Sequence, residues 1–394
     1  MKNVIKKIYL VLKNAVFIVL FFAILLNVMA FWAPLFRYEE DQLATGTVTT
    51  YYAQDENTVD VVFIGASSIY RYMAPTVMYD KYGITSLNFS TAGMPVECMS
   101  GLIDEVINTQ SPELIVLEVR DFVKWSERYD KGISSNTKKW LLQNESYINR
   151  LVNNMPISRA RAKIIHDSVN PLLGQKEWQW QFEYYKTHNN WKDLKVSDVT
   201  GYIKDKLDGK NEINTSDGEY KYTDYKGTAS LTQVYVADKP ADFSNYNNTK
   251  EITGEWFGVM EELVAHAKEC GTKVLFISTP YPATYNRVAY ENFLGEYIES
   301  QGLDYLNCNK LYDEIGIDFA SDFYDKKHTN LKGSIKVTEY VGNYIKETYG
   351  LKETKLTKAQ KADWDTAVEK WNKEVRYPGL VTIQQKVAKI NGAS

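Results

Sequence analysis

The sequence predicts an α/β fold in which helices cover both faces of a parallel sheet, preceded by a helix that crosses a membrane. Three observations predict it. Short aliphatic runs alternate with stretches of helical periodicity, several glycines stand between a helix and the next strand, and the chain opens with a long apolar run. Strands that are apolar throughout are typical of parallel sheets buried on both faces. We therefore expect a three-layer α/β domain with roughly five strands.

Residues 1–36 are expected to form a cytoplasmic tip and a membrane anchor. Four lysines precede an apolar run over residues 15–33, which Trp32 closes as an interfacial aromatic. At about 1.5 Å per residue, this run just spans a hydrocarbon core of about 30 Å. Lysines before the run favour a cytoplasmic N-terminus, a single crossing and an extracytoplasmic remainder. The alternative is a signal peptide that is cleaved near Ala30.

The strands and helices of the α/β domain follow in alternation. Strands are predicted from the apolar, β-branched runs at 59–64, 114–119 and 273–278, and two short strands are predicted at 86–89 and 304–306. Helices are predicted at 75–82, 96–109, 256–270, 287–301 and 331–349. Gly83, Gly271 and Gly302 stand between a helix and a strand, where a left-handed helix cap favours glycine.

The length suggests roughly two to three domains, or one domain with large insertions. We predict a linker at 37–57 and an α/β domain made of 58–121 and 253–349. Residues 122–252 are polar and aromatic and form an insertion, with tryptophans at Trp125, Trp140, Trp178, Trp180 and Trp191. These indoles are either a platform for sugar rings or the core of a small subdomain. Residues 350–394 are expected to form a helical tail with Trp364 and Trp371 on nearly one face.

The composition excludes several classes of protein. Of the 394 residues, 44% are hydrophobic and 24% are charged, an ordinary globular balance. The net charge of −4 offers no basic surface to a phosphate backbone, so we expect no nucleic-acid partner. Cys98, Cys270 and Cys308 form no CxxC pair, so neither a disulfide framework nor a thiolate zinc site is expected.

A serine stands at the end of the first predicted strand, in Gly65-Ala66-Ser67-Ser68. In an open parallel sheet, ligands bind at the carboxyl ends of the strands. A serine there is exposed and close to backbone NH groups that can stabilise an oxyanion. Ser67 is therefore the candidate nucleophile, with Ser68 as the second choice. The alternative is that either serine only caps the following helix.

Asp325 and His328 lie three residues apart just before the last predicted helix, so both side chains can point the same way. His328 would then deprotonate a serine hydroxyl while Asp325 orients the imidazole. We expect Ser67, His328 and Asp325 to meet at one strand-end cleft. No further ligand is clustered with His328, so we expect no metal site.

Asn88 and Gly93 lie in the segment NFSTAG after the second predicted strand. A glycine at this place lets backbone NH groups approach a ligand closely. We expect Gly93 to contribute to an oxyanion hole, and Asn88 and Ser68 to contact substrate. The alternative for this segment is an ordinary turn.

These motifs, in this order, resemble those of the SGNH (GDSL-like) hydrolase superfamily. The resemblance rests on Gly65 to Ser68, on the segment that ends at Gly93 and on Asp325 to His328, and it covers 58–121 and 253–349. It implies a flavodoxin-like sheet, a triad of Ser67, His328 and Asp325, and no cofactor. It also implies an oxyanion hole from the NH groups of Ser67 and Gly93 and an Asn after the third strand.

The chain departs from the family pattern at two places. The third block reads Glu118-Val119-Arg120-Asp121 and has no Asn, so Arg120 or Asp121 must take its place in the oxyanion hole. Arg120 is equally compatible with a plain salt bridge. Ala66 replaces the family's Asp. With the N-terminal anchor, these features resemble the envelope branch, which includes D-alanyl-lipoteichoic acid transfer proteins and alginate O-acetyltransferases.

Two functions follow from the resemblance. The first is an extracytoplasmic acyltransferase or esterase that acts on acyl esters of a cell-envelope polysaccharide or teichoic acid. A membrane-bound O-acyltransferase is then an expected partner. The second is a degenerate SGNH domain that binds polymer or acts as a scaffold for such a membrane enzyme. The missing third-block Asn favours the second function.

Overall fold

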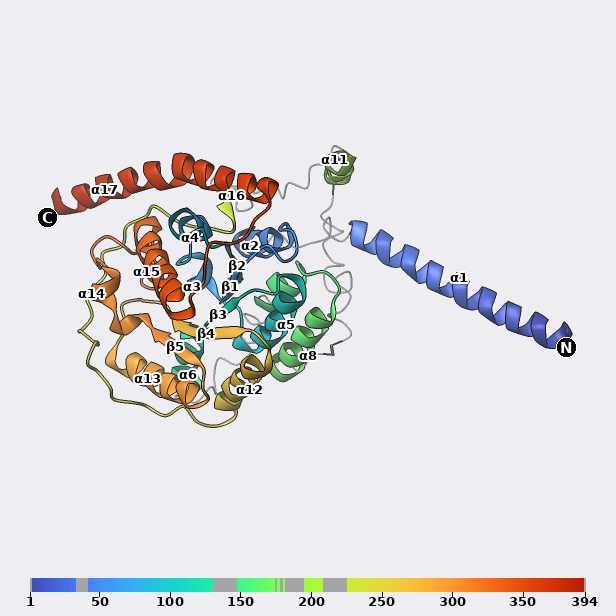
Figure 1. The fold of residues 1–394 in the computed structure, drawn as a ribbon, viewed down its shortest axis with the longest axis horizontal. Coiled ribbons are helices and arrows are strands. Elements are labelled where there is room, and N and C mark those ends of the chain that lie inside the picture. The colour runs from blue at the N-terminus through green and yellow to red at the C-terminus, as the bar shows by residue number, and fades with distance from the viewer. Residues whose placement is uncertain are drawn as a thin grey trace. The chain divides into compact units, whose positions relative to one another are not determined.

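The computed structural model describes residues 2–32, 42–129, 147–173, 176–177, 180, 195–207 and 225–392. The chain divides into two compact units. One consists of Met1–Glu40 and Lys176–Asn214, and the other of Asp41–Gln175 and Thr215–Ser394. The second unit contains the sheet and the C-terminal helices (Figure 1).

The predicted parallel sheet is confirmed. Its five strands are ordered β2-β1-β3-β4-β5, and every neighbouring pair is parallel. The strands are β1 (Val61–Gly65), β2 (Ser86–Ser90), β3 (Leu114–Glu118), β4 (Lys273–Ser278) and β5 (Asp304–Asn307). β1, β2 and β3 are buried along their whole length, which the apolar runs of β1 and β3 predict and which in β2 includes the polar Ser86, Asn88 and Ser90.

Helices cover both faces of the sheet (Figure 1). On one face, Phe63, Val116 and Ile277 share a hydrophobic core with α4 (Pro75–Tyr82) and α15 (Leu331–Tyr349). The alternate strand residues, such as Ile64 and Leu117, are also fully buried and point to the opposite face. There α5 (Met99–Thr109) packs against β1, and α8 (Arg159–Leu173) and α12 (Glu255–Glu269) pack against α5. The α/β class follows from this arrangement.

The remaining helices have the following bounds. They are α1 (Lys2–Trp32), α2 (Gln42–Tyr52), α3 (Ser67–Tyr70), α6 (Arg120–Tyr129), α11 (Val196–Leu207), α13 (Tyr285–Ser300), α14 (Tyr312–Ile315), α16 (Lys358–Trp371) and α17 (Tyr377–Gly392). Short turns of other helix types are η2 (Val96–Cys98), η5 (Cys308–Lys310) and η6 (Asn372–Arg376). Gly83, Gly271 and Gly302 have φ angles of 68°, 84° and 80°, as the sequence predicted for helix ends.

The helix α1 contains the apolar run that the sequence predicted. Within it, the segment Lys6–Val28 has a mean hydropathy of 2.5. The most apolar stretch of this segment has no buried residue. In the described part of the chain, this is the one helix that is long and apolar enough to cross a membrane. An uncleaved anchor and a signal sequence share this length and composition.

Residues on either side of the α/β core also pack on the sheet unit. The segment 37–57, expected to be a linker, contains α2, whose Tyr51 stacks on Phe89 of β2 at a ring distance of 4.1 Å. In the C-terminal tail, Trp371 and Ile383 join a core cluster with Leu331 of α15. Both segments are therefore integral to the α/β unit.

The segment 122–252 separates β3 from β4 and is divided between the two units. Its α8 packs on α5 of the sheet unit, whereas α11 belongs with α1. Trp140, Trp178, Trp191 and the side chain of Trp125 lie outside the described residues. Trp180 is described and is 2% exposed. Whether the tryptophans form a sugar platform stays a prediction.

The first turn of α15 is expected to require a glycine. A Cβ at Gly333 would overlap the carbonyl oxygen of Asp322 and lie 2.8 Å from Thr329 Cγ2. We predict that Gly333→Ala lowers the free energy of unfolding by about 1–3 kcal/mol, because the added methyl group overpacks a backbone contact. The midpoint of urea unfolding, followed by circular dichroism, measures the change.

The control is Gly258→Ala in the first turn of α12, where an added Cβ meets nothing within 4 Å. This exchange should raise the free energy of unfolding by up to about 1 kcal/mol through the helix propensity of alanine. If both variants shift stability in the same direction, the close approach of α15 to residue 322 is not what makes Gly333 necessary.

Candidate functional site

Ser67 is held at the carboxyl end of β1 by a tight turn into α3. A Cβ at Gly65 would lie 2.7 Å from Ile69 Cγ1 and 2.8 Å from Glu118 Cβ, so the last residue of β1 must be small. Ala66 is extended, with φ −85° and ψ −155°, and Ser67 is the first residue of α3. The turn leaves the Ser67 side chain partly exposed while Ser68 is fully buried.

The structure brings Ser67, His328 and Asp325 together. Ser67 Oγ lies 2.8 Å from His328 Nε2, although the two residues are 261 positions apart. On the other side of the imidazole, His328 Nδ1 lies 3.0 Å from Asp325 Oδ2 and 3.1 Å from Oδ1. These distances are those of a nucleophile, a base and an orienting carboxylate.

Asp325 is fixed by backbone donors of its own turn. Its Oδ1 accepts hydrogen bonds from the NH of Lys327 at 2.6 Å and from the NH of His328 at 2.8 Å. The turn closes where the Tyr324 NH donates to the His328 carbonyl at 3.1 Å, and Asn330 then caps α15. The turn therefore sets the position of the carboxylate before any substrate binds.

Tyr324 also restricts the rotation of the His328 imidazole, because its ring stacks on the imidazole plane. Its ring stacks on His328 with centroids 5.4 Å apart and planes at 12°, and its hydroxyl lies 3.2 Å from Nδ1. The Arg71 guanidinium lies 5.2 Å from the centre of the Tyr324 ring. The ring plane of His328 is thus defined by packing as well as by Asp325.

The charge states suit a general base at neutral pH. Burial lowers the pKa of His328 below 6.5, and the adjacent Asp325 opposes this effect. Burial acts to raise the pKa of Asp325, but the hydrogen bond and charge of His328, with the backbone donors, lower it to about 2. A neutral His328 with its proton on Nδ1 satisfies both contacts, since Nδ1 then donates to Asp325 and Nε2 accepts from Ser67.

The backbone NH groups of Ser67 and Gly93 are the two that the sequence predicted for an oxyanion hole, and Gly93 lines the same pocket as Ala66. Ser67 is the first residue of α3, and Gly93 has a φ of 65°. A side chain at Gly93 would strike the Tyr147 ring, 2.5 Å from an added Cβ. Within the described residues, no acceptor takes the NH of Ser67 or of Gly93. Helix-start NH groups of this kind stabilise negative charge.

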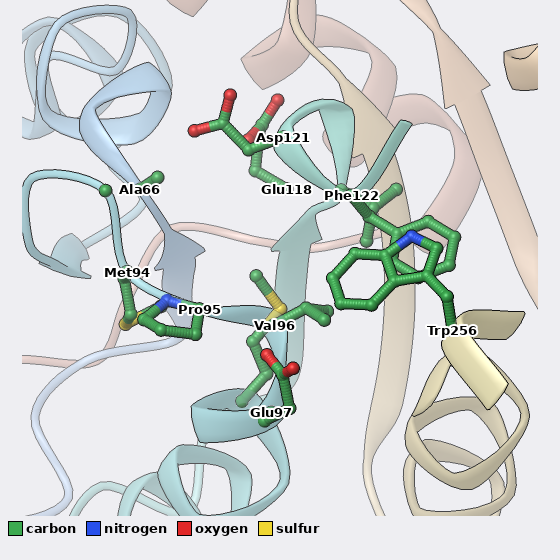
Figure 2. A pocket seen from close by; sticks show the side chains of 12 residues that line it. Ala66, Met94, Pro95, Val96, Glu97, Glu118, Asp121, Phe122 and Trp256 are labelled. Carbon is green, nitrogen blue, oxygen red and sulfur yellow. The ribbon is translucent and has the colours of Figure 1, made fainter. Parts of the chain in front are cut away.

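A small pocket, part of it open to solvent, adjoins the serine turn at Ala66, while Ser67, His328 and Asp325 are not among its lining residues. Figure 2 shows the rings of Phe122 and Trp256 on one side and Met94 and Pro95 on the other. The two rings stack at 4.8 Å. The lining also includes three carboxyl groups, namely Glu97, Glu118 and Asp121, and contains no Lys, Arg or His. Burial raises the pKa of Glu97 to about 7.

Below the serine turn lies a buried polar network around Glu118. Its carboxylate accepts hydrogen bonds from Ser68 Oγ and, at 3.2 Å, from Thr279 Oγ1 and the NH of Arg120. Burial raises the pKa of Glu118, against the charge of Arg120. Ser68 is fully buried and therefore anchors the turn to β3, and nothing in its contacts brings it to a substrate.

Of the two roles that the sequence left open for Arg120, its described contacts agree with ion pairing, since its Nε lies 3.9 Å from Glu118 Oε1. Its guanidinium is buried, 5.1 Å from the Tyr72 ring centre and 4.9 Å from the Tyr281 ring centre. Nη1 donates to the Tyr72 hydroxyl at 3.0 Å, and that hydroxyl donates to the Lys327 carbonyl at 2.7 Å. These contacts connect the end of β3 to the turn that holds Asp325 and His328. They leave the guanidinium engaged beneath the cleft, so the structure does not bring it to the oxyanion position.

Asp121, the other residue expected to replace the family's Asn, lines the pocket. Burial acts to raise its pKa, but the charges of Lys124, Arg120 and His328 outweigh burial and lower it. Asp121 is therefore an ionised carboxylate near the imidazole. A carboxylate accepts hydrogen bonds and cannot donate one to an oxyanion.

The structure does not bring Asn88 into the cleft. It is 1% exposed, and its Nδ2 donates to the carbonyl of Met73 at 2.9 Å and to that of Gly227 at 3.3 Å. Its side chain holds the backbone that follows α3.

The residues that sequence reasoning missed are Tyr72, Glu118 and Tyr324. Only Glu118 carried a signal, as a lone charge in an apolar strand.

No protein-family model matches the chain, and no curated protein matches its sequence. The site is therefore interpreted from its own geometry. Among the described residues, no group of three or more His, Cys, Asp or Glu side chains is arranged to hold a metal ion. The chemistry that the described side chains can support is proton transfer and nucleophilic attack by a serine.

The hydroxyl of Tyr72 is expected to hold the Asp325–His328 turn in place. We predict that Tyr72→Phe speeds hydrogen exchange of the Lys327 and His328 amides, because the Lys327 carbonyl loses its buried donor. The variant should also lose about 1–3 kcal/mol of stability, since Arg120 keeps a buried donor without its acceptor. Exchange followed by mass spectrometry on peptides that cover 324–330 measures the effect.

The matched control is Tyr312→Phe. Tyr312 is 6% exposed, and its hydroxyl donates to the Tyr281 carbonyl at 2.7 Å and not to a residue of the 324–330 turn. It should lose stability to a similar degree and leave exchange at 324–330 at the wild-type rate. Equal exchange in the two variants would show that Tyr72 does not hold the turn.

Proposed function

We propose that this protein is an SGNH-type serine acyltransferase or esterase that acts outside the cytoplasm on acyl esters of a cell-envelope glycopolymer. One observation carries the proposal. Ser67 Oγ, His328 Nε2 and Nδ1, and the Asp325 carboxylate form a continuous chain of contacts of 2.8–3.1 Å. Its members come from the end of the first strand and the start of the last sheet-covering helix.

The fold supports the SGNH assignment. The strand order 2-1-3-4-5 is the flavodoxin-like one, in which ligands bind at the carboxyl ends of the strands. Ser67 follows β1, Gly93 follows β2, and Asp325 and His328 precede α15, in the order of the family's motifs. With helices on both faces of the sheet, this corresponds to the three-layer arrangement of that superfamily.

The proposed mechanism uses the groups in the cleft. Ser67 Oγ attacks the carbonyl carbon of an ester while His328 Nε2 takes the hydroxyl proton. The NH groups of Ser67 and Gly93 stabilise the oxyanion, and Asp325 stabilises the imidazolium. His328 then protonates the leaving alcohol, which gives an acyl-enzyme. A hydroxyl of the acceptor, or water, attacks this acyl group while His328 takes its proton, and His328 then returns that proton to Ser67 Oγ as the bond between Oγ and the acyl carbon breaks.

The pocket beside Ser67 supports a short acyl group. Its apolar walls, formed by Met94, Val96, Phe122 and Trp256, lie next to Ala66 and Gly93. An acyl group on Ser67 would have to reach these walls past Ala66, since Ser67 itself is not among the lining residues. The stacked Phe122 and Trp256 rings limit its length.

The proposed location depends on α1. Its exposed apolar run fits a single-pass anchor, and the lysines before it favour a cytoplasmic N-terminus. The α/β unit would then lie outside the cytoplasm, where envelope polysaccharides and teichoic acids occur. A membrane-bound O-acyltransferase that supplies the acyl group is the proposed partner.

A second candidate function is a polymer-binding or scaffolding domain without catalysis. It is favoured by Asp121, whose ionised carboxylate lines the pocket beside His328. Negative charge at this place opposes the formation of an oxyanion. The two candidates differ in whether Ser67 reacts.

The decisive test is hydrolysis of p-nitrophenyl acetate by the purified full-length protein. We predict that Ser67→Ala lowers kcat/KM by about 10³-fold or more, because the nucleophile is removed. The matched control is Ser300→Ala at the exposed end of α13, which should hydrolyse the ester as the wild type does. If the wild type and Ser67→Ala hydrolyse the ester equally, the scaffolding function is the better account.

The pH dependence of hydrolysis reports on His328. The neutral imidazole is the base, and burial lowers its pKa below 6.5, so the rate should fall as the pH falls, with its inflection below pH 6.5. Asp325→Asn should reduce the plateau rate, since the orienting carboxylate is lost. An inflection above pH 7 would show that His328 is not the titrating base.

A further inference from the structure

The helix α11 (Val196–Leu207) has one apolar face that is open to solvent. Val196, Val199, Ile203 and Leu207 recur at intervals of three and four residues, which places them on one stripe. Val196 is 80% exposed, Ile203 37% and Leu207 82%. A helix in water buries such a stripe against another surface.

The opposite face of α11 is polar. Ser197, Asp198 and Gly201 lie there, all exposed. Lys204 is exposed at the border of the apolar stripe, where a long amine can reach away from an apolar surface. This combination of a narrow apolar stripe, a bordering lysine and a polar back is typical of helices that lie in a membrane interface.

The helix α11 is attached to the end of α1 that follows the apolar run. The Tyr202 ring packs edge-on against Phe31 at 5.7 Å and lies 6.1 Å from Trp32. Its hydroxyl donates to the Phe31 carbonyl. Both helices belong to the same compact unit. The stripe on α11 therefore has a fixed neighbour, namely the end of the helix proposed to cross the membrane.

The cluster of Phe31, Trp32 and Tyr202 indicates how deep α11 would lie in a membrane that α1 crosses. The exposed apolar segment of α1 ends at Val28, and Phe31, Trp32 and Tyr202 come together one turn later. Tyrosine and tryptophan are enriched where the hydrocarbon core meets the headgroups. An apolar stripe at this level is next to acyl chains rather than to bulk water.

We propose that α11 lies in the membrane interface, with Val196, Ile203 and Leu207 in the upper acyl chains and Lys204 among the headgroups. The inference rests on the proposed anchoring by α1 and adds a second contact with the lipid surface. The segment inserted between β3 and β4 thus contributes a membrane-binding element. The α/β unit is then connected along the chain to two lipid-bound helices instead of one.

The test measures lipid contact residue by residue in the full-length protein. Cys98 and Cys308 are buried, so Cys270→Ser gives a background for single-cysteine labelling. An NBD fluorophore is attached at Val196→Cys, Ile203→Cys or Leu207→Cys on the stripe. The matched controls are Ser197→Cys and Asp198→Cys on the polar face. The protein is reconstituted in phosphatidylcholine–phosphatidylglycerol vesicles that carry spin labels near the top of the acyl chains.

The expected result is periodic quenching. The three stripe positions should be quenched about threefold more strongly than the two polar positions and should emit at shorter wavelength. Equal, weak quenching at all five positions overturns the proposal. Blue-shifted but unquenched stripe labels also overturn it, because the stripe is then covered by protein, either the α/β unit or a second copy of the chain.

A label at Leu20→Cys in α1 separates this inference from the anchor on which it rests. Strong quenching of Leu20→Cys by lipids labelled deep in the bilayer, with no quenching on α11, contradicts only the interfacial position of α11. No quenching at Leu20→Cys contradicts the anchor and the interfacial helix together. Neither result bears on the reactivity of Ser67.

Discussion

The contact between Ser67 Oγ and His328 Nε2 is the constraint on which the rest of the site depends, because it joins two segments 261 residues apart. It forms only if β1 and the turn before α15 end at the same edge of the sheet. The parallel pairing of β1 with β2 and β3 brings Ser67, Gly93 and Asp121 to that edge. The packing of α15 on α4, on one face of the sheet, brings the His328 turn to it.

The contact is supported by a layer of buried polar side chains beneath the cleft. Glu118 holds Ser68, and through it the serine turn, whereas Tyr72 holds the Lys327 carbonyl and the histidine turn. Arg120 links the two halves, since it donates to the Tyr72 hydroxyl and lies 3.9 Å from Glu118. Such a network rigidifies a site when all its members are satisfied. The nucleophile and the base are thus positioned by one connected set of groups.

Much of the fold could be predicted from the sequence, because apolar strands and helix-ending glycines are local signals. The meeting of Ser67, His328 and Asp325 could be predicted too, since both segments flank the carboxyl ends of parallel strands. The direction of Arg120 could not, because its long side chain follows the rings of Tyr72 and Tyr281, which come from distant segments. The helix α2 was missed because its sequence, QLATGTVTTYY, is short and weakly amphipathic and is stabilised by packing on β2.

The central claim, that this geometry makes Ser67 a nucleophile, is tested most directly by where a fluorophosphonate attaches to the folded protein. Peptide mapping by mass spectrometry should find one phosphonyl group, on Ser67. The adduct should be absent from His328→Gln, in which the fold is kept but the base is lost. An adduct on another residue, or none on wild-type protein that is shown to be folded, would contradict the account.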